Sequence, residues 1–358
     1  NVDVPGNPNG QVATLSDQAV CNGNNTAEVI FVTNRTGGTT TYTWTNSNTN
    51  IGLAATGTSA GITSFTATNT GTAQINGLIT VTPHFANGSV TCTGTATSFR
   101  IRVNPIGQVN QPADLVRCTG ANASVTFSSV NTPAGNTTYA WTNSNTNIGL
   151  AVSGNGNISF TATNTTIAPI SGTIVVTPTF TQNGTACAGT SKSFSITVNP
   201  AGQVNDPADQ VLCNNAATTQ VDFTTNNTGG TTTYSWTNSN TTIGLAASGT
   251  GATIHSFTAL NTGTEPVIAT ITVTPTFANG GQNCPGPVQT FTITVNPSPT
   301  VSSAATRTIC SSSSVNYTIT SATTGTTFTW AASVWTPPAG GTITGFSDCS
   351  STCGALIG

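Results

Sequence analysis

The sequence predicts an all-β chain built from tandem antiparallel β-sandwich domains, three complete and one partial. The segment Trp-Thr-Asn-Ser-Asn-Thr occurs three times, beginning at Trp44, Trp141 and Trp236, and defines a repeat of about 96 residues. Within each repeat, short alternating runs of apolar and polar residues are separated by Gly, Asn and Pro, and no window has a helical period. A period of this length indicates a whole domain, because the units of a solenoid are about 20–50 residues long.

The dipeptide Asn-Pro marks the start of each repeat, at Asn7, Asn104, Asn199 and Asn296. We expect residues 1–6 to end a preceding unit or to form a linker strand. The expected β-sandwich repeats are repeat 1 (7–105), repeat 2 (106–200), repeat 3 (201–297) and a partial repeat 4 (298–358). Because proline fixes one backbone torsion, these short joints should hold a limited range of angles.

The strands expected in repeat 1 illustrate the pattern. They cover residues 29–33, 41–45, 62–68, 79–83 and 99–103. Tyr42 and Trp44 alternate with threonines and should share the buried face of their strand. About seven short strands with a buried tryptophan in each repeat fit an immunoglobulin-like sandwich. The tryptophans expected to pack the four cores are Trp44, Trp141, Trp236 and Trp330.

Cysteine spacing predicts one disulfide within each full repeat. The paired positions are Cys21 with Cys92, Cys118 with Cys187, and Cys213 with Cys284. Zinc is disfavoured, because the repeat contains neither Cys-x-x-Cys pairs nor a matching histidine, and regular disulfides indicate an extracellular protein.

Repeat 4 departs from this pattern. Cys349 and Cys353 are close enough in sequence for a local bridge, which leaves Cys310 waiting for a partner beyond Gly358. We expect either a longer parent chain or a strand donated by a neighbouring subunit, for which residues 1–4 are a candidate.

Charged residues make up 4% of the chain, with 6 Lys and Arg against 9 Asp and Glu, and the net charge is −3. So few basic residues exclude nucleic acid as a partner and exclude a basic membrane-surface patch. The chain contains no signal peptide and no apolar run of membrane-spanning length, so membrane insertion is not expected. The uncharged surface also lacks the repulsion that keeps proteins apart, which favours association with other copies or other surface proteins.

No set of residues predicts catalysis. His84 and His255 occupy different positions in different repeats and are expected at the surface. One aspartate recurs near each joint, at Asp17, Asp114 and Asp209. Two interpretations stay open for it: a calcium ion that stiffens the joint, or a turn in which the carboxylate accepts local backbone N–H groups. No other metal or cofactor is expected, and neither is enzymatic activity.

The motifs as a set resemble a known family. Thr-Tyr-x-Trp-Thr-Asn-Ser-Asn, Val-Thr-Pro-x-Phe and a closing Ile-Thr-Val-Asn-Pro are similar to the PKD-like repeats of large surface proteins of Bacteroidetes. The resemblance implies secretion, often by the type IX system, and membership of giant adhesins or gliding-type surface filaments. The expected function is an extracellular stalk or spacer of a bacterial surface adhesin or filament. Two alternatives remain: a self-assembling filament subunit completed by strand donation, and a glycan-binding surface module.

Overall fold

The computed structural model describes residues 8–307, 310 and 316–329, and these residues form an all-β structure. The fold class is confirmed: each of repeats 1 to 3 is a two-sheet β-sandwich with a hydrophobic core of its own. Residues 1–199 form one compact unit and residues 200–358 another. The predicted core residue Trp330 and the predicted Cys349–Cys353 bridge lie outside the described residues.

The strands recur in the same order along the chain, with a 3₁₀ helix after the third strand of each repeat and a further one before the third strand of repeat 2. In repeat 1 they are β1 (Gln18–Cys21), β2 (Val29–Ile30), β3 (Thr39–Asn46), the 3₁₀ helix η1 (Thr49–Ile51), β4 (Thr56–Gly57), β5 (Gly61–Ile62), β6 (Ile75–Asn87), β7 (Val90–Thr93) and β8 (Thr97–Asn104).

In repeat 2 they are β9 (Leu115–Cys118), β10 (Asn122–Val125), η2 (Ala134–Asn136), β11 (Thr137–Asn143), η3 (Thr146–Ile148), β12 (Ser153–Asn155), β13 (Ile158–Thr161), β14 (Ile170–Gln182), β15 (Thr185–Ala188) and β16 (Lys192–Asn199).

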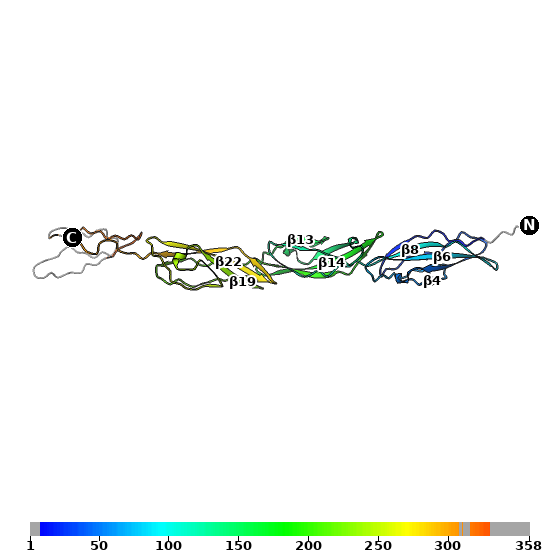
Figure 1. Cartoon of the computed structure of the whole chain (residues 1–358), viewed down its shortest axis with the longest axis horizontal. Coiled ribbons are helices and arrows are strands. Elements are labelled where there is room, and N and C mark those ends of the chain that lie inside the picture. The colour runs from blue at the N-terminus through cyan, green and yellow to red at the C-terminus, as the bar shows by residue number, and fades with distance from the viewer. Residues whose placement is uncertain (1–7, 308–309, 311–315, 330–358) are drawn as a thin grey trace, which may run out of the picture. The chain divides into compact units, whose positions relative to one another are not determined.

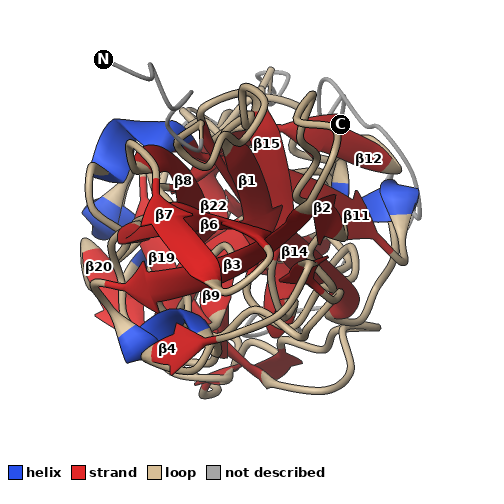
Figure 2. Ribbon diagram, turned by 90° about the vertical axis from the view of Figure 1, so that its right-hand side faces the viewer, coloured by secondary structure: helices blue, strands red, loops and turns tan. Residues whose placement is uncertain are grey.

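In repeat 3 they are β17 (Gln210–Cys213), β18 (Val221–Asp222), β19 (Thr231–Asn238), η4 (Thr241–Ile243), β20 (Ser248–Thr250), β21 (Thr253–Ile254), β22 (Val267–Asn279), β23 (Gln282–Pro285) and β24 (Gln289–Asn296). Figure 1 labels β6 and β8 of repeat 1, β14 of repeat 2 and β22 of repeat 3. Helix is confined to the short 3₁₀ turns drawn in blue in Figure 2, and no helix of the described residues is long and apolar enough to cross a membrane.

The large sheet of repeat 1 has the strand order β1-β8-β6-β3-β4, and β7 pairs with β6. The small sheet consists of β2 and β5. All strand pairs are antiparallel except β1 with β8, where Cys21 lies opposite Asn104. The first and last strands of a repeat therefore run side by side to the same end of the domain, the end from which the next repeat continues.

Alternating burial along the long strands builds the core. In β3, Tyr42 and Trp44 are buried, while Thr41, Thr43 and Thr45, which alternate with them, are exposed. In β6, Ile79 and Val81 have no exposed surface, and burying side chains of this size stabilises a fold by about 1.5–3 kcal/mol each. The predicted pattern of inward aromatic and aliphatic residues is therefore present in the structure.

The strand predicted at 62–68 is shorter than expected. Regular pairing ends at Ile62, and a single bridge joins Asn25 to Thr66. Between them the Thr26 hydroxyl accepts from the Phe65 N–H (3.2 Å), and the Ser64 hydroxyl donates to the Thr26 carbonyl (2.7 Å). The Thr26 N–H also donates to the Phe65 carbonyl (2.9 Å), so side-chain hydroxyls supplement an interrupted backbone ladder here.

Candidate functional site: the joint between repeats

A disulfide crosses the joint between repeats 1 and 2. Cys21, at the end of β1, is bonded to Cys187, on β15, with an S–S distance of 2.01 Å and a Cα–Cα distance of 5.5 Å. The predicted pairing of cysteines within each repeat is therefore wrong. Cys92 and Cys213 are free thiols, whereas Cys118 and Cys284 are disulfide-bonded.

The strand register explains why cysteines of one repeat do not pair with each other. Cys21 lies opposite Asn104, at the end of repeat 1. Cys92 lies opposite Phe85, and its carbonyl accepts from the N–H of Gly10, at the start of the repeat (3.4 Å). The two thiols therefore lie near opposite ends of the domain, beyond the reach of a disulfide, which needs Cα atoms within about 7 Å. The partner of Cys21 has to come from the next repeat.

The asparagine of the Asn-Pro motif organises this joint. Asn104 has no exposed surface. Its Nδ2 donates to the carbonyls of Gln182 (2.9 Å) and Thr185 (3.1 Å), which flank the tip of the β14–β15 hairpin of repeat 2. Its Oδ1 accepts from Nε2 of Gln74 (2.5 Å). A buried amide satisfied on both its donor and its acceptor side fixes orientation, because each unmade bond would leave a polar group unpaired in the interior.

Further contacts hold the joint on both sides. Beside the disulfide, the Thr185 hydroxyl donates to the Ala19 carbonyl of β1 (3.3 Å). On the other side, the Thr132 N–H of repeat 2 donates to the Thr72 carbonyl of repeat 1 (2.8 Å), and the buried Asn131 side chain accepts from the Gln108 N–H of the linker (2.7 Å). Repeats 1 and 2 are thus connected by the chain, by one disulfide and by two sets of hydrogen bonds.

Two glycines allow the linker between repeats 1 and 2 to pass close to the β14–β15 hairpin that carries Cys187. The Gly107 N–H donates to the Cys187 carbonyl (3.0 Å), and the Gly189 N–H donates to the Pro178 carbonyl (2.8 Å). A Cβ atom on Gly189 would lie 1.6 Å from the Gly107 oxygen, so only glycine fits where the linker crosses the hairpin. The same crossing joins Gly94 to Gly10 and Gly286 to Gly202. The sequence signal that we missed is Cys-x-Gly, present at all three second cysteines.

The repeated Trp-Thr-Asn-Ser-Asn segment is a structural motif. The buried Asn46 side chain donates to the Leu53 carbonyl (3.0 Å) and accepts from the Asn48 N–H (3.0 Å). Asn48 caps η1 by accepting from the Asn50 N–H (3.1 Å), and Ser47 accepts from the Leu78 N–H (2.9 Å). These side chains hold the turn that follows Trp44, and the corresponding turns have the same arrangement in repeats 2 and 3.

The recurrent aspartates bond to a distant strand. Asp17 accepts from the Arg100 N–H (2.7 Å), and its second oxygen pairs with Arg102 (2.8 Å). In the other repeats, Asp114 accepts from the Ser195 N–H and Asp209 from the Thr292 N–H, both at 2.6 Å. The partner is on the last strand rather than in a local turn, so the turn interpretation is wrong. No group of three or more His, Cys, Asp or Glu side chains that could hold a metal ion occurs among the described residues.

These bonds predict acid sensitivity. The backbone hydrogen bond from the last strand is the largest cause that holds the pKa of Asp17, Asp114 and Asp209 below the ordinary value. A lowered folded-state pKa contributes stability that is present above the unfolded pKa of about 3.9 and is lost as the pH falls through the folded pKa. We expect the melting temperature to fall as the pH drops below about 4. A triple variant with asparagine at all three positions, which keeps the acceptor oxygen, should drop less. Equal acid slopes in thermal melts from pH 6 to pH 2 would contradict this role.

Of the two histidines expected at the surface, His255 is exposed and His84 is half-buried. His84 lies between Thr43 and Thr93, each with a hydroxyl 3.1 Å from a ring nitrogen, and His255 lies 3.4 Å from the Gln220 oxygen. The hydrogen-bond partners given for the two rings are the hydroxyls of Thr43 and Thr93 and the amide oxygen of Gln220, and Gln220 in turn donates to Asp222 (2.9 Å).

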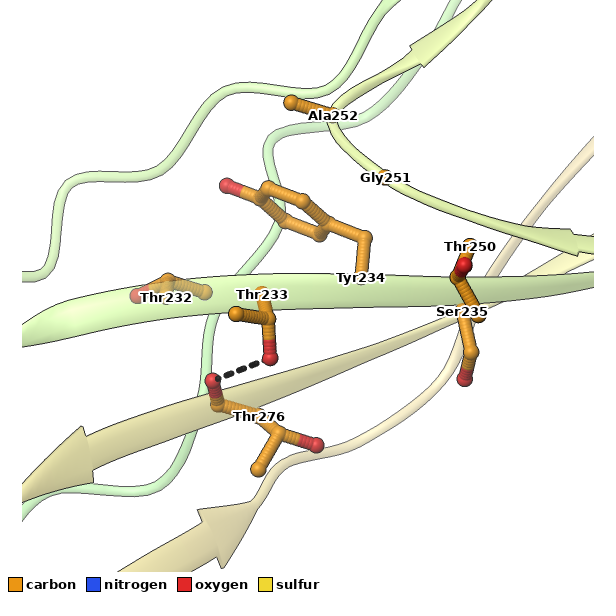
Figure 3. Close-up of a pocket in the computed structure, with 8 residues that line it drawn as sticks. All are labelled: Thr232, Thr233, Tyr234, Ser235, Thr250, Gly251, Ala252 and Thr276. Carbon is orange, nitrogen blue, oxygen red and sulfur yellow. Dashed lines mark hydrogen bonds between the residues drawn. The ribbon is translucent and has the colours of Figure 1, made fainter.

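A hollow in repeat 3 has no charged lining residue. Figure 3 shows Tyr234 between Thr232 and Ala252, with the Thr233 hydroxyl bonded to the Thr276 carbonyl (3.5 Å). The lining offers hydroxyl groups and one aromatic ring.

The chain is similar to several solved tandem structures. Mouse protocadherin-24 EC1-3 is 14% identical, with 81% of this chain and 100% of that chain covered and a TM-score of 0.31. Mouse cadherin-23 EC22-24 is 12% identical, covering 79% and 96%, with a TM-score of 0.31. The I9-I11 tandem from titin is 14% identical, covering 80% and 99%, with a TM-score of 0.28. No protein-family model and no curated protein sequence matches this chain.

Proposed function

We propose that this chain is a non-enzymatic, extracellular stalk segment of a bacterial surface adhesin or filament. The observation that carries the proposal is the disulfide between Cys21 and Cys187, which connects consecutive repeats. Such bonds persist outside the cytosol, where reducing systems do not break them. The PKD-like motifs of Bacteroidetes surface proteins and export by the type IX system fit the same role.

The disulfide gives the stalk a mechanical property. Tension that enters at the start of repeat 1 reaches Cys21, passes directly to Cys187 and leaves through β16. The segment between the two cysteines, which holds the cores around Trp44 and Trp141, is bypassed by this covalent path. Even with both cores unfolded, the stalk would keep most of its length. A protein that spans a gap under load requires this resistance.

Pulling single molecules with force tests the proposal. The disulfide closes a loop with a sequence separation of 166. At 3.3–3.6 Å per extended residue, full reduction should release at least about 550 Å of additional contour length. A Cys92→Ser variant should behave as the unmodified chain does, because Cys92 is a free thiol. Equal contour lengths for the oxidised and the reduced chain would contradict a load-bearing joint.

A further inference from the structure

The two free thiols of repeats 1 and 3 stand where their counterparts are bonded. Cys92 lies opposite Phe85 as Cys187 lies opposite Phe180. Cys213 lies opposite Asn296 in the parallel pair of β17 and β24, as Cys21 lies opposite Asn104. Each thiol therefore lies in one half of a joint of the kind that connects repeats 1 and 2.

The face around Cys213 is more exposed than the corresponding face around Cys21, which the β14–β15 hairpin of repeat 2 covers. This face, formed by β17 and the end of β24, is called the β17 face. Cys213 is exposed, whereas Cys21 is 8% exposed. Val211, the counterpart of Ala19, is 71% exposed. Asn104 is completely buried by the hairpin of repeat 2, but Asn296 is only half-buried.

The joint of repeats 1 and 2 shows what would cover the β17 face. Asn104 binds two carbonyls at the tip of a hairpin, a hydroxyl of the hairpin donates to the Ala19 carbonyl, and a cysteine of the hairpin bonds Cys21. In the described part of the chain, the Asn296 side chain has no such carbonyl partners. The occupant therefore has to be a β-hairpin with a free cysteine in its second strand.

This chain contains one such hairpin among its described residues. Three hairpins combine a 13-residue strand with a four-residue strand that carries a cysteine: β6–β7, β14–β15 and β22–β23. Cys187 and Cys284 are already disulfide-bonded, which leaves the β6–β7 hairpin with Cys92. The described part of repeat 4 contacts repeat 3 at two places: the Thr324 hydroxyl donates to Glu265, and the Ser298 hydroxyl accepts from Nδ2 of Asn214, next to Cys213 (3.3 Å). Cys213 and Val211 of the β17 face stay exposed beside this contact.

We propose that the β6–β7 hairpin of a second copy of this chain docks on the β17 face, and that Cys92 of that copy forms a disulfide with Cys213. The contact joins unlike surfaces, so it repeats from copy to copy and generates a head-to-tail chain of molecules. Because both surfaces are almost free of charge, no electrostatic repulsion opposes the approach.

The bond forms by thiol–disulfide exchange with a low-molecular-weight disulfide as the oxidant. The Cys213 thiolate attacks the oxidant, forms a mixed disulfide and releases one thiol. The Cys92 thiolate of the docked copy then attacks the Cys213 sulfur, and the second thiol leaves. Two protons are lost from the two cysteines, and the oxidant takes up the two electrons.

Mixing two complementary variants tests the proposal. Both carry Cys310→Ser, Cys349→Ser and Cys353→Ser; one adds Cys92→Ser and the other Cys213→Ser. With oxidised glutathione, the mixture should give a covalent heterodimer whose digest contains a peptide with Cys92 bonded to Cys213. Neither variant alone should give a dimer. The substituted cysteines of repeats 1 and 3 are free thiols, so the Cys21–Cys187 bond is retained.

A docking control distinguishes a built contact from random collision of thiols. Adding Val211→Asp to the Cys92→Ser chain places a charge on the β17 face and leaves Cys213 intact. It should slow heterodimer formation at least about tenfold, which corresponds to about 1.4 kcal/mol of docking free energy. Absence of the heterodimer, or an unchanged rate with Val211→Asp, would overturn the proposal. This inference rests on the geometry of the joint and not on the stalk function. If the heterodimer formed but pulling showed no difference in contour length between the oxidised and the reduced chain, the stalk function would be refuted and the contact between copies would stand.

Discussion

A Gly189→Ala substitution is expected to open repeat 2 at its cysteine hairpin. The new methyl group would lie 1.6 Å from the Gly107 oxygen and 2.5 Å from the Gly107 carbonyl carbon. Both are backbone atoms, so no side chain can rotate away. The linker and hairpin must separate, which also breaks the two hydrogen bonds of the crossing. Overpacking costs about 1–3 kcal/mol and each lost bond about 0.5–1.5 kcal/mol, so the free energy of unfolding should fall by about 2–6 kcal/mol.

Hydrogen–deuterium exchange, followed repeat by repeat, measures this effect. We expect faster exchange in β14, β15 and β16, and in β1, because Cys21 is held through the same hairpin. Gly135→Ala is the matched control, since a Cβ atom there meets nothing within 4 Å. It should change stability by less than about 0.5 kcal/mol. A Gly189→Ala chain with the stability of the control would show that the crossing is not tight.

The sandwich was predictable because burial alternates with sequence along its strands. Tyr42 and Trp44, separated by one threonine, have to lie on the same face of a strand, and the structure buries both. The short strands were less predictable. β2 and β5 pair over two residues each, and beyond them isolated backbone bonds alternate with bonds to side-chain hydroxyls such as that of Thr26. An alternation of apolar and polar residues in the sequence does not reveal a segment whose backbone is bonded to side chains.

The disulfide pairing was not predictable from the cysteine spacing. Spacing shows that each repeat has a first and a second cysteine, and the shorter loop of about 70 residues favours pairing within the repeat. The parallel pairing of β1 with β8 decides otherwise, because it carries Cys21 to the end of the domain beside Asn104. A connection between the first and last strands of a domain depends on the fold as a whole. The Asn-Pro motif predicts the boundary between repeats, and its asparagine is also the hydrogen-bonding centre of the joint.

The conserved form of the Trp-Thr-Asn-Ser-Asn segment within this chain has a structural cause. In repeat 2, Nδ2 of Asn143 donates to the carbonyls of Asn145 (2.9 Å) and Leu150 (2.9 Å), and Oδ1 accepts from the Asn145 N–H (3.0 Å). Asn143 is 5% exposed, so water cannot replace these bonds. The side chain closes the turn through η3 back onto the end of β11. The corresponding asparagines thus bind the same leucine carbonyl in all three domains, that of Leu53, Leu150 or Leu245.

An Asn143→Ala substitution should therefore lower the free energy of unfolding of repeat 2 by about 3 kcal/mol, because each buried carbonyl left without its donor costs about 1–3 kcal/mol. Asn147→Thr is the control from the same turn: Asn147 is exposed, and repeat 3 has Thr242 at that position. The control should stay within about 0.5 kcal/mol of the unmodified chain in denaturant titrations. If both variants were equally stable, the turn would not need Asn143. Its threefold repetition would then have to reflect a ligand that all three repeats bind, which would favour the glycan-binding alternative over a stalk.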